Sequence, residues 1–216
     1  MPVKSKILIV DDHPVVRWGM SQMLNQEDDL EICCEAGNEA VAMKALANCR
    51  HDLVIVDLSL EGVSGLSLIK SIKALDADMP ILVMSMHDET IYAERALRAG
   101  ARGYIMKHEA PDNILRAIRQ TLAGDMYVSD KMRSKLLAQI FDGQGNAPST
   151  PVETLSDTEL EVLKLVGKGL STRASAELMN RSVKTIESHR RNIQEKLQLK
   201  SSLELVRFAT RWIEPS

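Results

Sequence analysis

The chain has 216 residues, enough for one large domain or two small ones, and its 44% apolar and 26% charged content is ordinary for a globular protein. Aromatic residues make up only 3%, so a hydrophobic core must be built from Val, Ile, Leu, Met and Ala. No apolar run approaches the roughly 20 residues that a helix needs to span a bilayer, and the amino terminus lacks a signal peptide's apolar segment, so we expect a cytosolic protein.

The net charge of −3 is unevenly divided along the chain. Residues 1–125 carry 13 Lys and Arg against 19 Asp and Glu, a difference of −6, whereas residues 155–216 carry 11 against 8, a difference of +3. Within residues 181–211 the count is 8 against 3, a difference of +5. An acidic first part and a basic region near the end indicate two modules with different partners.

Strand and helix signals alternate five times in the first module. Short apolar runs bounded by turn residues predict strands buried on both faces, and apolar residues at helical spacing predict helices. The predicted strands are residues 7–10, 30–36, 53–56, 81–84 and 103–106, and the predicted helices are residues 14–24, 39–49, 65–75, 89–99 and 111–124. This alternation predicts right-handed crossovers and a doubly wound α/β fold with a parallel sheet covered on both sides.

Polar groups end four of these strands: Asp11 with Asp12, Asp57, Ser85 and Lys107. Because the carboxyl ends of parallel strands meet at one edge, we expect these groups to lie together. Three carboxylates repel one another unless a cation neutralises them, and Mg²⁺ with its oxygen ligands fits best. An Asp can then act as a nucleophile to form an aspartyl phosphate, with Lys and a hydroxyl holding the phosphoryl oxygens. The alternative is a set of loop or helix-capping carboxylates beside a solvated lysine.

Several short motifs in the first module occur together at the expected places. They are Ile7–Asp12, Asp57 after its apolar strand, Gly65, Pro80, Ser85, Gly100–Tyr104 and Lys107. With these motifs, residues 5–124 resemble the receiver domain of a two-component response regulator.

The resemblance implies that Asp57 accepts a phosphoryl group from a sensor histidine kinase. It implies that Mg²⁺ binds at Asp11, Asp12, Asp57 and the backbone carbonyl of Ser59. Lys107 would contact the phosphoryl group, and Ser85 with Tyr104 would form a switch that turns inward on phosphorylation. Most receivers have proline where His108 follows the lysine, so the local loop departs from the family pattern.

Residues 126–141 predict one further helix, with an apolar stripe of Met132, Leu136, Leu137 and Ile140. Residues 142–151 are rich in turn formers and poor in apolar side chains, which predicts a linker. The chain therefore divides into a receiver at 5–124, a connecting helix and linker at 125–154, and a second domain at 155–216.

The three cysteines are Cys33, Cys34 and Cys49, and their spacing matches no common metal-binding motif. An odd number suits a reducing compartment better than a set of disulfides. We expect them to serve as small, buried apolar residues.

The second domain predicts four short helices. Ser156 and Glu159 have capping-box spacing at the start of the first helix, and Asn180–Arg181 predicts a turn between the second and the third. Such an order is typical of a helix-turn-helix domain. On the third helix, residues 183–197, the apolar positions are Ile186, Ile193 and Leu197, and the polar face carries Lys184, Glu187, Ser188, Arg191 and Glu195. This polar face can enter the major groove of DNA; the alternative is a solvated amphipathic helix.

A second set of motifs covers this domain. It comprises Leu155–Ser156, Glu159, Val162–Leu163, Gly169–Ser171, Ala176–Glu177, Ser182, Lys184–Ile186, His189, Ile193, Lys196–Leu197 and Leu205–Val206. With these motifs, residues 155–212 resemble the LuxR-type DNA-binding domain of NarL-like regulators. By position, the residues that would face bases are Glu187, Ser188 and Arg191, and those near phosphates are Lys184, Thr185, Arg190 and Lys196.

Two residues depart from the LuxR-type pattern. Ser175 takes the usual Ile position, which should weaken the packing of the second helix, and Glu187 takes a position usually filled by Lys. A carboxylate repels phosphates and can accept a hydrogen bond from cytosine N4, so the preferred operator should differ from that of close relatives.

Together these features predict a response regulator in which phosphorylation of Asp57 controls binding to double-stranded DNA. We expect a regulator that is not an enzyme and that forms a homodimer when phosphorylated or DNA-bound. The dimer contact is open between the receiver, the last helix (Leu203, Val206 and Ala209) and both.

Two alternatives remain. A Mg²⁺-dependent phosphohydrolase would use Asp57 as nucleophile, but Ser59 stands where such enzymes place a general acid. The second alternative is an output domain that binds protein, which would fit the departures at Ser175 and Glu187. A DNA-binding assay at several salt concentrations distinguishes it from a DNA-binding domain, because affinity should fall steeply with salt if several phosphates are contacted.

Overall fold

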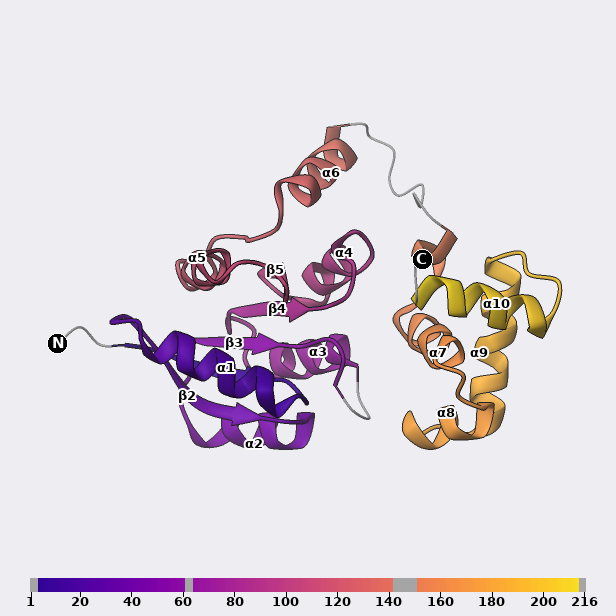
Figure 1. Cartoon of the computed structure of the whole chain (residues 1–216), viewed down its shortest axis with the longest axis horizontal. Helices are drawn as coiled ribbons and strands as arrows, with labels where there is room; N and C mark the ends of the chain where they lie inside the picture. Colours follow the sequence, from indigo (N-terminus) through magenta and orange to yellow (C-terminus); the bar gives the residue numbers. More distant parts are fainter. Residues whose placement is uncertain (1–3, 61–63, 142–150, 214–216) are drawn as a thin grey trace. The chain divides into compact units, whose positions relative to one another are not determined.

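A computed structural model describes residues 4–60, 64–141 and 151–213 (Figure 1). The chain divides into two compact units, Met1–Gly143 and Gln144–Ser216. The predicted linker lies outside the described residues except for its last residue, Pro151, which begins a short 3-10 helix. No helix in the described ranges combines the length and apolar character that crossing a membrane requires.

A parallel sheet of five strands forms the centre of the described part of the first unit, in the order β2-β1-β3-β4-β5 (Figure 1). The strands are β1 (Ser5–Val10), β2 (Leu30–Ala36), β3 (Leu53–Val56), β4 (Ile81–Ser85) and β5 (Gly103–Met106). All neighbouring pairs are parallel. The chain first builds outward from β1 to β2 and then returns across β1 to β3, which confirms the predicted doubly wound topology.

Helices cover both faces of this sheet. They are α1 (Pro14–Asn25), α2 (Glu39–Asn48), α3 (Gly65–Leu75), α4 (Glu89–Ala99) and α5 (Pro111–Leu122). A further helix, α6 (Asp130–Phe141), packs against α4. Met20 and Leu24 of α1 and Ile114 of α5 join one buried cluster with residues of the sheet. Buried residues of α3 and α4, such as Ile69 and Ala93, lie outside that cluster and cover the opposite face.

The predicted helix over residues 126–141 was wrong at its start, because α6 begins at Asp130. Tyr127 instead pairs in parallel with Gly103, and its carbonyl accepts a hydrogen bond from the Tyr104 N–H at 2.8 Å. This extended segment satisfies backbone groups along the edge strand β5, which a helix starting at Met126 would leave unpaired.

Helix α6, predicted as part of a connecting segment, is tied to the first unit. The backbone N–H and the hydroxyl of Ser129, just before α6, both donate to the Glu89 carboxylate of α4. Met132 is buried, whereas Leu137 of the predicted apolar stripe is exposed. The side chain of Ile140 lies outside the described part of the chain.

The expectation of buried cysteines was wrong. Cys33 and Cys49 are exposed, and Cys34 is half-buried. Strand β2 lies at the edge of the sheet, and its pairing with β1 shifts register between Ile7 and Leu8, so that Cys33 is an extra residue in a bulge. An unpaired residue on an edge strand keeps contact with solvent.

The second unit consists, in its described part, of a short 3-10 helix and four α-helices. They are η1 (Pro151–Thr154), α7 (Asp157–Gly167), α8 (Thr172–Leu178), α9 (Val183–Lys196) and α10 (Ser202–Ile213). The predicted capping box is present: Ser156 N–H donates to Glu159 Oε2 at 2.8 Å, and Glu159 N–H donates to Ser156 Oγ at 3.3 Å. Asn180 has a φ of 50°, a left-handed conformation that ends α8 and permits the turn into α9.

Ser175 of α8 is fully buried. Its hydroxyl has no hydrogen-bond partner among the described residues. Leaving a buried hydroxyl unsatisfied costs about 1–3 kcal/mol, and serine fills less volume than the isoleucine usual in LuxR-type domains. Both effects act in the direction of the predicted weaker packing of α8.

Gly65 begins α3 where the backbone passes close to the end of β3. A Cβ atom at this position would lie 2.3 Å from the Asp57 carbonyl oxygen and 2.5 Å from Leu58 Cα. The Gly65 N–H donates to the Leu58 carbonyl at 3.1 Å. Only glycine permits this approach, which holds the segment that carries Asp57 against the start of α3.

Gly65→Ala should therefore lower the free energy of unfolding by about 1–3 kcal/mol, because backbone atoms of Asp57 and Leu58 must move. Urea unfolding of the full chain measures the change. Gly19→Ala is the matched control: a Cβ at Gly19 in α1 meets nothing within 4 Å and should raise stability by about 0.5–1 kcal/mol. Similar effects of both substitutions would contradict the close approach.

Candidate functional site

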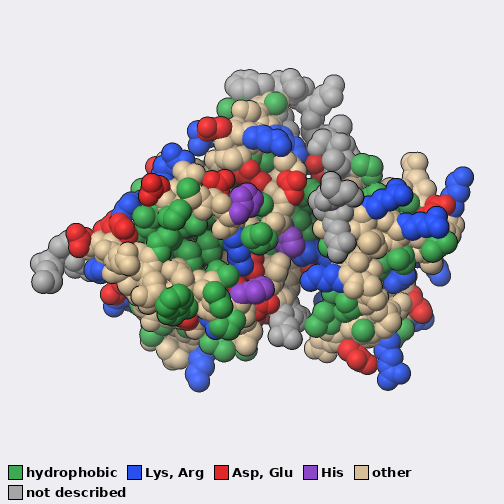
Figure 2. Space-filling model, in the orientation of Figure 1, with side chains coloured by type: hydrophobic (Ala, Val, Ile, Leu, Met, Phe, Trp, Pro, Cys, Tyr) green, Lys and Arg blue, Asp and Glu red, His purple; other side chains and the backbone are tan. Residues whose placement is uncertain are grey.

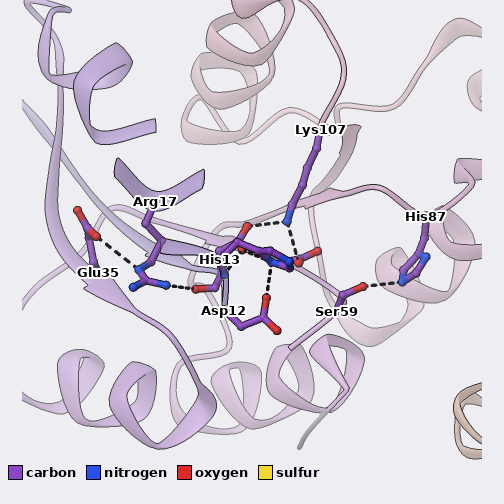
Figure 3. A network of polar contacts seen from close by, with 9 residues as sticks. Asp12, His13, Arg17, Glu35, Ser59, His87 and Lys107 are labelled. Carbon is purple, nitrogen blue, oxygen red and sulfur yellow. Dashed lines mark hydrogen bonds and ion pairs between the residues drawn. The ribbon is translucent and has the colours of Figure 1, made fainter. Parts of the chain in front are cut away.

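The structure brings three strand ends together through one lysine. Lys107, directly after β5, places its Nζ 2.6 Å from Asp11 Oδ2 and 2.8 Å from Asp57 Oδ2 (Figure 3). The carboxylates are 1% and 2% exposed and the lysine side chain 10%. The buried ammonium of Lys107 thus offsets part of the repulsion between the two carboxylates. The neighbouring His108 is exposed.

The pKa values in this cluster reflect burial and charge. Burial raises the pKa of Asp57, and the hydrogen bond and charge of Lys107 offset this only in part. Burial lowers the pKa of Lys107, but hydrogen bonds to Asp11 and Asp57 outweigh burial and raise it above its ordinary value. Asp57 Oδ1 is buried without a hydrogen-bond partner among the described residues. That oxygen is therefore available to a cation or to an electrophile.

Asp12 and His13 extend the cluster. His13 Nδ1 lies 2.6 Å from Asp12 Oδ1 and 3.3 Å from Asp11 Oδ1, and the His13 N–H donates to Asp11 Oδ1 at 2.9 Å. Ligand atoms of Asp11, Asp12, His13 and Asp57 all lie within 4.8 Å of one another. These residues can hold a metal ion. Sequence reasoning missed His13, for which adjacency to Asp12 was the only signal.

Arg17 fixes the loop after β1. Its guanidinium donates to the Asp11 carbonyl at 2.6 Å, and its Nε lies 3.5 Å from Glu35 Oε2 (Figure 3). Ser21 Oγ donates to Glu35 Oε1 at 2.7 Å. Arg17 therefore links the backbone of Asp11 to the end of β2. Sequence reasoning did not single out Arg17.

A second polar chain joins the end of β3 to the loop before α4. Ser59 Oγ lies 2.7 Å from His87 Nε2 (Figure 3). The His87 ring stacks on Tyr92 with centroids 4.8 Å apart. The His87 N–H donates to Ser85 Oγ at 3.1 Å, and the Tyr104 hydroxyl donates to the His87 carbonyl at 2.7 Å. Burial raises the pKa of the fully buried Tyr104, which keeps its hydroxyl a donor. His87, which sequence reasoning missed, connects both predicted switch residues.

In the second unit, α9 presents a polar face to solvent. Ile186 and Ile193 are fully buried, whereas Glu187, Ser188 and Arg191 are exposed. Lys and Arg side chains predominate over Asp and Glu on the face of this unit visible in Figure 2. The geometry of α9 therefore suits a helix that contacts a polyanion.

The residues predicted to lie near phosphates differ in their surroundings. Lys184 is exposed and Arg190 is half-buried. Thr185 lies at the helix start, where its N–H donates to the Ser182 hydroxyl at 3.1 Å and its own hydroxyl lies 2.8 Å from that oxygen. Thr185 therefore also takes part in capping α9.

Lys196 forms an ion pair within the unit. Its Nζ lies 2.6 Å from Glu159 Oε2, which links the end of α9 to the start of α7. Burial raises the pKa of Glu159, but hydrogen bonds from Lys196 and Ser156 outweigh burial and lower it. This contact gives Lys196 a structural partner beside the DNA contact predicted for it.

Comparison with known proteins agrees with both units. Residues 7–119 match the family described as response regulator receiver domain, and residues 153–209 match bacterial regulatory proteins of the luxR family. The oxygen regulatory protein NreC of Staphylococcus carnosus is 38% identical over 208 residues, covering 94% of this chain and 96% of that protein.

Solved structures of RcsB from Salmonella are also similar. The structure of RcsB reported for conformational dynamism in DNA interaction has a TM-score of 0.75 at 26% identity, covering 97% of this chain and 98% of that chain. The structure of RcsB bound to the rprA promoter with the phosphomimetic BeF₃⁻ has a TM-score of 0.71 at 26% identity, covering 96% and 99%. The present chain therefore belongs to the two-component response regulators in which a receiver domain controls a LuxR-type DNA-binding domain and transcription.

Proposed function

We propose that Asp57 is the phosphoryl acceptor of this regulator and that its phosphorylation controls DNA binding by α9. The observation that carries this proposal is the free, buried Oδ1 of Asp57 beside the ammonium of Lys107. Oδ1 attacks the phosphorus of a donor, and the donor's leaving group departs as an acyl phosphate forms. Lys107, already within 2.8 Å of the other oxygen, would then hold a phosphoryl oxygen.

The acidic cluster fits Mg²⁺. Asp11, Asp12 and Asp57 offer three carboxylates against one ammonium, and Asp57 Oδ1 lacks a hydrogen bond. Hard oxygen ligands suit Mg²⁺, which would neutralise the incoming phosphoryl group. The proposed ligands are the carboxylates of Asp11, Asp12 and Asp57 and the backbone carbonyl of Ser59.

Ser85 and Tyr104 are the proposed switch. Both contact His87, at the loop that precedes α4, and both are fully buried. A phosphoryl group on Asp57 would compete with the His87 N–H for the Ser85 hydroxyl. Moving this loop would alter α4 and the attached α6, and so change the surface of the receiver.

The DNA contacts follow from the exposed face of α9. Glu187, Ser188 and Arg191 are proposed to face bases, and the proposed phosphate contacts are Lys184, Thr185, Arg190 and Lys196. The serine and threonine side chains among them are short and the lysines and arginines are cationic, which suits the major groove and its phosphates.

The proposed partners are a sensor histidine kinase, double-stranded DNA and a second copy of the chain. Leu203 and Val206 of α10 are exposed apolar residues that support a dimer contact, whereas Ala209 is fully buried and unavailable for it. Val15 and Trp18 of α1 form a further exposed apolar pair, to which a partner can dock.

We also propose a regulator without turnover of a separate substrate, because Ser59 binds His87 and offers no general acid.

Treatment with a small-molecule phosphodonor and Mg²⁺ should place one phosphoryl group on the chain and change DNA affinity by at least about fivefold. Asp57→Asn should abolish both effects, and Asp28→Asn, which alters an exposed carboxylate, should retain them. Phosphate incorporation and DNA binding are measured on the same samples. If the Asp57→Asn variant still incorporates phosphate, Asp57 is not the acceptor. If DNA affinity does not change on phosphorylation, phosphorylation does not control DNA binding.

Without divalent cations, Asp57→Asn should stabilise the chain at neutral pH. Burial raises the folded-state pKa of Asp57 above its unfolded value, so ionisation costs stability as pH rises from the unfolded pKa of about 3.9. The asparagine avoids this cost, and its advantage should shrink as pH falls toward about 4. Urea unfolding at several pH values tests this, with Asp28→Asn as control. A variant less stable than wild type at pH 7 would mean that attraction to Lys107 outweighs burial.

Glu187→Lys should change the sequences recovered in unbiased binding-site selection, because a base-facing carboxylate becomes a cation. Glu195→Lys is the matched control on the same exposed face, with the same change of charge. Both substitutions should strengthen non-specific binding, and only the first should alter the selected sequence. If wild type and Glu187→Lys select the same DNA sequences, Glu187 does not contact a base. If DNA affinity does not depend on salt concentration, the second domain is better explained as a protein-binding output.

A further inference from the structure

A second group of metal-ligand side chains lies away from the acidic cluster. Cys33 and Cys34 come from β2, and His51 comes from the segment that leads into β3. One ligand atom of each lies within 4.8 Å of the others. The histidine follows the nearer cysteine, Cys34, by 17 positions in the chain, so it is the fold that brings these residues together.

The bulge in β2 explains how two consecutive cysteines share one side. In a regular strand, neighbouring side chains point to opposite faces. Here Ile7 pairs with Ile32 and Leu8 pairs with Cys34, which leaves Cys33 as the extra residue. Its Sγ lies 3.6 Å from the Ile7 carbonyl, and a bulge of this kind re-aims a side chain. The local irregularity therefore gathers both thiols.

His51 is a buried imidazole whose two ring nitrogens lack hydrogen-bond partners among the described residues. It is 8% exposed, and neither Nδ1 nor Nε2 makes a hydrogen bond of acceptable geometry with the described residues. Such a buried polar group calls for a partner. Burial lowers the pKa of His51, so the ring is neutral at physiological pH and has a lone pair to offer.

Cys49 lies nearby but outside this group of three residues. It follows α2, two residues before His51, and burial together with the Cys49 thiol raises the pKa of Cys34. Partial burial raises the pKa of Cys33 to about 11, so a cation that binds there must displace protons. Thiolate and imidazole ligands select softer cations than the oxygen ligands of the acidic cluster do.

We propose that Cys33, Cys34 and His51 bind a thiophilic divalent cation, Zn²⁺, with water in the fourth position. Two thiolates and one imidazole with a water molecule are a known tetrahedral set for Zn²⁺. The ion joins the edge strand β2 to the segment that enters β3 and thereby fastens the edge of the sheet. The site is separate from the acidic cluster that takes up Mg²⁺.

The experiment uses the full-length chain, reduced and freed of metal, in excess Mg²⁺ to occupy the acidic cluster. Zn²⁺ is titrated in competition with a chromophoric chelator, and Co²⁺ serves as a spectroscopic probe. We expect one equivalent of Zn²⁺, a thiolate-to-Co²⁺ charge-transfer absorption, and a rise in the thermal midpoint on adding Zn²⁺. Absence of the charge-transfer absorption overturns the proposal.

Cys33→Ser, Cys34→Ser and His51→Gln should each weaken Zn²⁺ binding by at least about tenfold. Circular dichroism and phosphate incorporation check that each variant folds, and the exposed Cys33 keeps the test decisive if His51→Gln does not fold. His108→Gln, at an exposed histidine outside the cluster, is the control and should bind as wild type does. Binding that survives Cys33→Ser, or that a folded His51→Gln leaves unchanged, overturns the proposed ligand set.

Discussion

The contact of one lysine with two buried carboxylates is the constraint on which the receiver unit depends. Lys107 follows β5, yet its ammonium reaches past β4 to Asp57 after β3 and to Asp11 after β1. Without that cation, the carboxylates would face each other in a medium that screens charge poorly. The long, flexible lysine stem makes the reach possible. Lys107 contacts only one oxygen of Asp57, and the other oxygen makes no hydrogen bond with the described residues. The contact that stabilises this edge of the sheet therefore also leaves an oxygen able to react.

The second unit uses its charges in another way. Buried Ile186 and Ile193 fix one face of α9, so the opposite face with Glu187 and Arg191 must point to solvent. The ion pair between Lys196 and Glu159 holds the far end of that helix against the start of α7. A helix held at both ends by the core can present its polar face as a preformed surface, which reduces the entropy lost on binding.

Local patterns were enough to locate most of the elements. The predicted boundaries of β2 and α3 agree with the structure, because apolar periodicity acts within a few positions of the chain. The convergence of Asp11, Asp57 and Lys107 also followed, since strand ends of a parallel sheet share one edge. The start of α6 did not follow, because Tyr127 pairs with Gly103, a partner 24 positions earlier that no local pattern reveals.

The sequence by itself determined the class of fold, the two-domain order and the three carboxylates of the acidic cluster, because periodicity and motif spacing are properties of neighbouring positions. Only the tertiary structure decided that Arg17 braces the Asp11 backbone, that His87 joins both proposed switch residues, and that Cys33 leaves the regular pleat. Each of these depends on strand register and on contacts between distant segments. A shift of one position in register changes which side chains meet, and the sequence pattern does not encode that choice.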